Sequence, residues 1–232
     1  GYLGMYLFLM GKYLEKTEIT DLPEYWKKGI SLALKKIQSL MQDGITQVSE
    51  ENTTAYLMDN LEVWRGLYEL ELARLKDMQA ISEMRKKIQA QIEKTFWDDA
   101  NQRWRIIRSS DLYHPTEFYP DGVAQIYPLI CEFPVKEKKK QKILYDQFTE
   151  RFQWQKLNKK RTGFLWAMTG MAAAQMGDIN NLVELIGNYE AEYCENRKYP
   201  LYTGEAGWIC MECGKLYGLY ERKIKTGFIL CA

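Results

Sequence analysis

Residues 54 to 73 read TAYLMDNLEVWRGLYELELA, and this stretch decides the fold. Its apolar side chains recur every three or four positions, which is the period of an α-helix with one buried face. The first half also carries acids, an amide and large aromatic rings, at Tyr56, Asp59, Asn60, Glu62 and Trp64. Such side chains either cap and pack the helix or line a place where a polar, ring-shaped ligand binds.

The same period continues through most of the chain. Helices are expected over residues 3–14, 23–41, 53–76, 81–97, 121–133, 135–152, 163–176, 178–194 and 204–220. Residues 98–120 show no helical stripe, which indicates a long loop in which RWRIIR forms a short strand or hairpin arm. Helices rich in small and aromatic residues alternate with helices that have a charged outer face. This alternation predicts an all-α chain of paired helices, stacked as an open solenoid or as a closed ring.

The composition narrows the class of protein. A chain of 232 residues can form one large domain or two small ones. Its 32 basic and 31 acidic side chains almost cancel, which argues against nucleic acid as the main partner. The apolar opening, residues 1–10, is too short for a membrane span, which needs about 20 residues. Five scattered cysteines form no disulfide framework, so both the cytoplasm and export are compatible with the composition.

Polar and aromatic side chains gather at the starts of alternate helices, each time after a loop. The candidate site residues in these four clusters are Tyr56, Asp59, Asn60 and Trp64; Tyr119, Asp121 and Gln125; Arg161 and Trp166; and Tyr202, Glu205 and Trp208. In a ring of helix pairs, these starts would converge on one cleft.

Carboxylates beside aromatic rings are what glycoside hydrolysis needs, because one acid protonates the leaving oxygen while a second attacks the sugar or activates water. Asp59, Asp121 and Glu205 are therefore the candidate catalytic acids, although helix capping explains any single one of them. The other members of the clusters are the candidate substrate contacts. Their rings would stack on the sugar, and their amide and guanidinium groups would bind its hydroxyls.

Three segments resemble a known group of enzymes: YLMDNLEVWRGLYEL, WRIIRSSDLYHPTEFYPDGVAQIYPLI and YPLYTGEAGWICMECGKLY. They are similar to the six-hairpin glycosidase superfamily, and most of all to its bacterial glycoside hydrolase family 8-like polysaccharide hydrolases. The resemblance implies an (α/α)6 toroid, an extracellular or cell-envelope location and a polysaccharide or oligosaccharide ligand. By position, it makes Asp59 an inner-wall carboxylate near the scissile sugar. It makes Asp121 and Glu205 supporting or sugar-binding residues.

Two features depart from the family pattern. The expected helices make fewer than six pairs, and no acid precedes Glu15, whereas the family places a catalytic acid early in the chain. We therefore expect residues 1–232 to form a single complete or partial toroid that lacks some N-terminal helices.

One alternative is a non-catalytic ring or solenoid that binds a glycan or a protein. Another is a toroid enzyme of a different class, with WDDAN as the only Asp pair for a terpene cyclase, or Tyr119 and Arg161 for a lyase.

The remaining motifs give no support to metal or cofactor chemistry. Cys210 and Cys213 form a C-x-x-C pair, but zinc needs further ligands at paired spacing, so we expect structural thiols. His114 is the only histidine and has no nucleophile near it in sequence for a catalytic triad. Neither of the glycine-rich nucleotide-binding patterns occurs. The preferred prediction is hydrolysis of a glycosidic bond by carboxylate acid–base chemistry, without a metal or cofactor.

Overall fold

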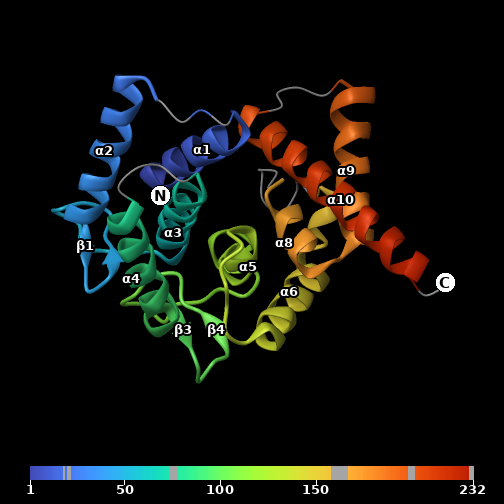
Figure 1. Ribbon diagram of the computed structural model, residues 1–232. Helices are drawn as coiled ribbons and strands as arrows, with labels where there is room; N and C mark the ends of the chain where they lie inside the picture. The colour runs from blue at the N-terminus through green and yellow to red at the C-terminus, as the bar shows by residue number, and fades with distance from the viewer. Residues whose placement is uncertain (18, 20–21, 74–77, 158–166, 198–201, 230–232) are drawn as a thin grey trace. The chain divides into compact units, whose positions relative to one another are not determined.

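The computed structural model describes residues 1–229 except 18, 20–21, 74–77, 158–166 and 198–201, without the side chains of Met78 and of residues 222–229. In this part of the chain the α-helices predominate and each strand is two residues long, so the predicted all-α class is confirmed (Figure 1). The chain divides into two compact units, residues 1–113 and 114–232. No helix in the described ranges has the length and apolar content needed to cross a bilayer.

The first unit contains helices and two short hairpins. Its elements are α1 (Tyr2–Thr17), α2 (Glu24–Ser39), β1 (Met41–Gln42), β2 (Ile45–Thr46), α3 (Leu57–Leu72), α4 (Met78–Phe96), β3 (Trp97–Asp98) and β4 (Arg103–Trp104). β1 pairs with β2, and β3 pairs with β4, both in antiparallel register. The helix expected from residue 53 begins only at Leu57, because Tyr56 is extended and forms a β-bridge with Ile107.

Helices α1 and α3 have the most extensive contact among the helices described in this unit. Glycines let the two backbones meet: a Cβ atom on Gly4 would come within 2.5 Å of the main chain at Val63, and one on Gly11 within 2.6 Å of the main chain at Glu69. Helix α4 packs against α3 as well. The buried face of α3 supplies the core with Leu57, Leu61, Val63, Trp64, Leu67 and Leu70.

The interface between α1 and α3 also buries charge. Arg65 and Glu69, one turn apart in α3, form an ion pair at 2.5 Å and are both almost fully buried. Lys12 of α1 reaches the same carboxylate at 2.9 Å. Because each buried charge has an opposite partner, the network is tolerated in the core, and removal of one member would leave the others uncompensated.

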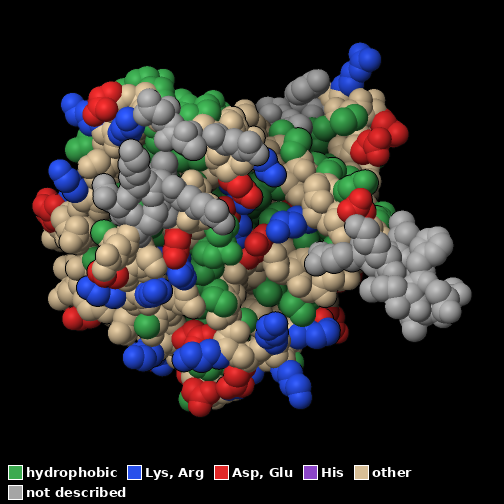
Figure 2. Space-filling model, viewed as in Figure 1, with side chains coloured by type: hydrophobic (Ala, Val, Ile, Leu, Met, Phe, Trp, Pro, Cys, Tyr) green, Lys and Arg blue, Asp and Glu red, His purple; other side chains and the backbone are tan. Residues whose placement is uncertain are grey.

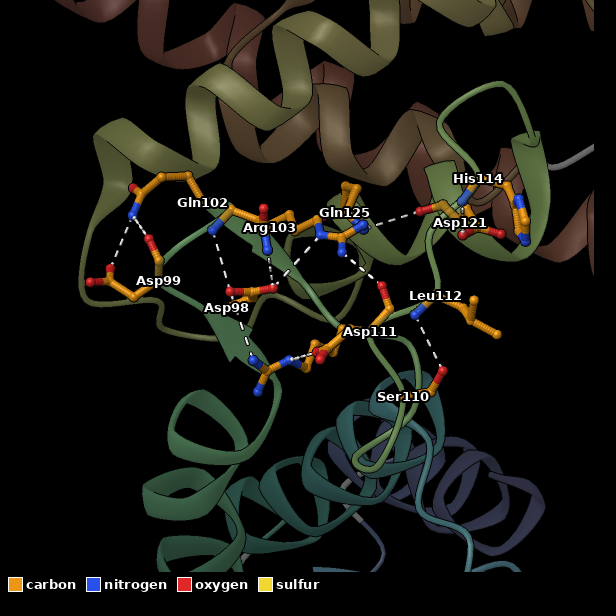
Figure 3. Close-up of polar contacts among 12 residues, drawn as sticks. Asp98, Asp99, Gln102, Arg103, Ser110, Asp111, Leu112, His114, Asp121 and Gln125 are labelled. Atoms are coloured by element: carbon orange, nitrogen blue, oxygen red, sulfur yellow. Dashed lines mark hydrogen bonds and ion pairs between the residues drawn. The ribbon is translucent and has the colours of Figure 1, made fainter.

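Ion pairs hold the segment that follows α4. Asp98 is buried and accepts hydrogen bonds from the main chain and side chain of Asn101. The guanidinium groups of Arg103 and Arg105 lie 3.8 and 3.7 Å from its carboxylate oxygens (Figure 3). Arg105 also pairs with Asp111 at 2.8 Å. The predicted loop therefore contains the short strand expected in RWRIIR and is fixed by charge pairing.

The second unit is built around α5. Its elements are the π-helical turn η1 (Phe118–Gly122), α5 (Val123–Ile130), α6 (Lys138–Phe152), the 3-10 turn η2 (Trp154–Lys156), α8 (Thr169–Met176), α9 (Ile179–Tyr189), the π-helical turn η3 (Glu190–Glu195) and α10 (Thr203–Ile229). Every residue of α5 is buried. Helix α5 packs against α6 and α8, and α8 packs in turn against α9 and α10. The small residues of α8, TGMAAAQM, permit this close packing.

Acidic and basic side chains are interspersed on the face of the molecule that Figure 2 presents. This distribution matches the near-zero net charge of the sequence.

Candidate functional site

One buried side chain ties the start of α3 to the β1–β2 hairpin. The Oδ1 atom of Asn60 accepts hydrogen bonds from the main-chain N–H of Thr46 at 2.7 Å and from its hydroxyl at 2.9 Å. The Nδ2 atom donates to the carbonyl oxygens of Thr46 at 3.1 Å and Tyr56 at 2.9 Å. A side-chain amide donates two hydrogen bonds and accepts two, so these contacts use its whole capacity. Asn60 therefore has no free group with which to bind a sugar as predicted. Its role in the described structure is to hold the hairpin against α3.

The aromatic rings predicted beside Asn60 have structural partners as well. Trp64 is buried, and its Nε1 donates to Oε1 of Gln89 on α4 at 3.2 Å. Its ring stacks on that of Tyr68, with the centroids 5.4 Å apart. Tyr56 is partly buried at the β-bridge that precedes the helix. Much of the polar and aromatic character of this stretch is therefore explained by packing.

A pocket of about 670 Å³ opens at the same end of α3. Its wall is formed by the start of α1, the end of α2, the β2 strand with the residues after it, and the first turns of α3. The lining residues are Gly1, Tyr2, Leu3, Met5, Lys36, Ile37, Leu40, Thr46, Gln47, Val48, Asp59, Glu62 and Val63. A volume of this size is typical of sites that bind small molecules.

Asp59 and Glu62 place two carboxylates on this wall. They are three residues apart in α3 and so share one face of the helix. One oxygen of each lies 2.6 Å from the position that a Cβ atom would take on Gly1, so the two oxygens are at most twice that distance apart. The Asp59 side chain is 39% exposed, and the Gly1 nitrogen lies 3.4 Å from its Oδ1. The sequence prediction names Glu62 among the polar residues of this helix but makes only Asp59 a catalytic candidate; the i, i+3 spacing is the signal that joins the two acids.

In the second unit, Asp121 holds the turn before α5. It is buried, and its Oδ1 accepts a hydrogen bond from the main-chain N–H of His114 at 2.7 Å (Figure 3). Gln125 is also buried and donates to the carbonyl oxygen of Asp121 at 3.1 Å. Gln141 of α6 donates to the carbonyl oxygen of Gln125 at 2.8 Å. Asp121 and Gln125 of the second predicted cluster thus fix the entry to α5 with their side chains turned inward, whereas Tyr119 of the same cluster is exposed.

Glu205, the third predicted acid, is buried at the start of α10. Its Oε2 accepts hydrogen bonds from the Tyr189 hydroxyl at 2.6 Å and from the main-chain N–H of Ala167 at 2.7 Å. Burial raises the pKa of Glu205, and these two hydrogen bonds oppose that rise. Burial and the bonded carboxylate also raise the pKa of Tyr189.

Glu212, two turns further along α10, is a buried acid that sequence reasoning misses. It is fully buried, and a Cβ atom on Gly170 of α8 would lie 2.5 Å from its Oε1. Within the described residues neither carboxylate oxygen has a hydrogen-bond partner. Burial, and secondarily the charge of Glu205, raise the pKa of Glu212 to about 9. Its seven-residue spacing from Glu205 on one helix is the signal that could have found it.

The remaining predicted contacts are distributed over the second unit. Tyr119 and Tyr202 are exposed, and Trp208 of α10 is partly buried. Arg161 and Trp166 lie outside the described residues. Asp59 belongs to the first unit, whereas Asp121 and Glu205 belong to the second.

No group of three or more His, Cys, Asp or Glu side chains in the described part of the chain could hold a metal ion. Comparison of the chain with models of protein families, with curated proteins and with solved structures finds no match. A function must therefore be argued from the site itself.

Proposed function

We propose that the chain hydrolyses glycosidic bonds in a polysaccharide or oligosaccharide, and that Asp59 and Glu62 supply the two carboxyl groups. The observation that carries this proposal is a pair of carboxylate oxygens, at most about 5 Å apart, on the wall of a pocket of about 670 Å³. The complete or partial (α/α)6 toroid and the extracellular or cell-envelope location of a bacterial enzyme belong to the same proposal, through the resemblance of the sequence to the six-hairpin glycosidases.

The separation of the two acids favours one stereochemical course. Retaining glycosidases place their carboxyl groups about 5–5.5 Å apart, whereas inverting enzymes need about 6.5–9.5 Å to admit a water molecule. In the proposed reaction, one carboxylic acid protonates the leaving oxygen while the other carboxylate attacks the anomeric carbon. Water then breaks the glycosyl ester, and the first group accepts its proton. The upper bound of about 5 Å between one oxygen of Asp59 and one of Glu62 lies below the separation that inverting enzymes need, and it therefore favours this double displacement.

The surroundings of the pair suit a polar ligand. Tyr2 is almost fully exposed and lies on the pocket wall, where its ring can stack on the apolar face of a sugar. Lys36, also on the wall, is paired with Glu50 at 2.6 Å. Asn60 positions the acids indirectly, because it fixes the turn of α3 that carries them. In this proposal Asp121 and Glu205 are not catalytic. They keep the supporting role that the resemblance implies, as buried acids of the second unit at the start of α5 and of α10.

The test is release of reducing ends from a panel of α- and β-linked polysaccharides. Asp59→Asn and Glu62→Gln should each lower the rate by about 10²- to 10⁴-fold, because each removes a proton-transfer or nucleophilic group without changing its size. Asp146→Asn, which makes the same change on the exposed face of α6, should leave the rate unchanged. The first product anomer seen by NMR should have the configuration of the substrate.

Two results would overturn the proposal. Full activity in both Asp59→Asn and Glu62→Gln would place the chemistry elsewhere. Glycan binding in calorimetry with no bond cleavage in any polymer would instead support the non-catalytic, glycan-binding alternative.

A further inference from the structure

Helix α10 presents two cysteines to solvent. Cys210 and Cys213 are both free thiols on exposed residues, so the predicted structural role gains no support from burial in the core. Residues three apart in a helix are neighbours on one face.

The position of this pair in its helix argues against redox catalysis. Reactive C-x-x-C cysteines commonly lie at a helix N-terminus, which activates them, whereas these lie in the third turn and beyond of Thr203–Ile229. A disulfide needs Cβ atoms about 3.5–4.5 Å apart. Helix neighbours at this spacing hold their Cβ atoms about 5–6 Å apart. An unbroken helix therefore disfavours a direct sulfur–sulfur bond.

The same spacing suits an ion that sits between the two sulfurs. Thiolates are soft ligands and select soft cations such as Cu(I). Zinc requires four ligands, and in the described part of the chain no third His, Cys, Asp or Glu joins a group that could hold a metal. A two-sulfur site is consequently suited to a cation that accepts two ligands.

We propose that Cys210 and Cys213 bind one monovalent soft cation of the Cu(I) type, held between their sulfur atoms on the exposed face of α10. Binding forms two metal–sulfur bonds and releases the two thiol protons, with no change in the oxidation state of copper or sulfur. The site is independent of the proposed glycosidase pocket, which belongs to the first unit of the chain.

The experiment is a competition for Cu(I) between the reduced full-length chain and bicinchoninate under anaerobic conditions, followed by absorbance. The wild-type chain should withdraw one Cu(I) per molecule. Cys210→Ser and Cys213→Ser should each weaken binding by about 100-fold or more, because the second thiol of a pair acts at a high effective concentration. Both thiols are exposed, so circular dichroism should show unchanged folding in these variants.

The matched control is the double variant Cys194→Ser with Cys231→Ser, which keeps the C-x-x-C pair and should bind as the wild type does. X-ray absorption at the copper edge should count two sulfur ligands. The proposal is overturned if either single variant keeps wild-type affinity, if the control variant loses it, or if the wild-type chain takes no copper. A copper-dependent dimer in size-exclusion chromatography would also overturn it, because the ion would then bridge two chains.

Discussion

Asn60 and Thr46 are joined by three hydrogen bonds across fourteen residues of sequence. Thr46 lies on the pocket wall, and Asn60 directly follows Asp59 in the first turn of α3. The side-chain amide therefore fixes the β1–β2 hairpin and the acid-bearing turn against each other. It acts on the proposed site by positioning, without touching the ligand.

Replacement of Asn60 by Ala should destabilise the protein by at least about 2 kcal/mol, because it strands buried donor and acceptor groups of Thr46. Urea unfolding of the two chains measures this difference. Asn180→Ala, at an exposed position of α9, should change stability by less than about 0.5 kcal/mol. Equal effects of the two substitutions would remove the structural role assigned to Asn60.

Glycines at the α1–α3 contact should not tolerate a side chain. In Gly66→Ala the new methyl group would overlap the carbonyl oxygen of Gly4, and main chain cannot move aside as a flexible side chain can. We expect a loss of about 1–3 kcal/mol from this overpacking. Gly187→Ala in α9 is the matched control, because nothing lies within 4 Å of its added Cβ atom. It should stabilise the helix by up to about 1 kcal/mol, measured in the same thermal or urea unfolding experiment.

The helical part of this fold is predictable because its signal is local. The apolar stripe of residues 57–72 is strong enough to place α3 to within a few residues at its start. The error at residues 53–56 has a long-range cause, since Tyr56 pairs with Ile107 far along the chain. Likewise, the ion pairs of Asp98 with two arginines stabilise a hairpin where residue patterns alone indicate mainly a loop.

The candidate site is less predictable, because residue type does not reveal what a side chain faces. Asp59 and Asn60 are neighbours in sequence, yet one lines a pocket and the other is buried behind it. The neighbours of Glu212 in sequence, MECGK, give no sign of its burial, so its seven-residue spacing from Glu205 is the one available signal. Its environment is set by Gly170, forty-two residues earlier, whose missing side chain leaves room for the carboxyl group.

The buried Glu212 should make the stability of the protein depend on pH. Its pKa is about 9 in the folded chain, against 4.5 as the ordinary value for a glutamate. Between these values the folded state retains a proton that the unfolded state has lost. Rising pH therefore favours unfolding, and the contribution of this group falls by up to about 1.4 kcal/mol per pH unit. The loss begins near pH 4.5 and is complete above about pH 9.

Glu212→Gln removes this ionisation while it keeps the size of the side chain. A buried amide without partners has its own cost, so the informative quantity is the slope of unfolding free energy against pH, not its value at one pH. We expect urea unfolding between about pH 6 and 8 to give a clearly shallower slope for the variant than for the wild type. Glu150→Gln, on the exposed side of α6, should keep the wild-type slope. If Glu212→Gln kept it too, the carboxyl group of Glu212 would have to be ionised in the folded chain, and the closed packing of α8 on α10 would be wrong.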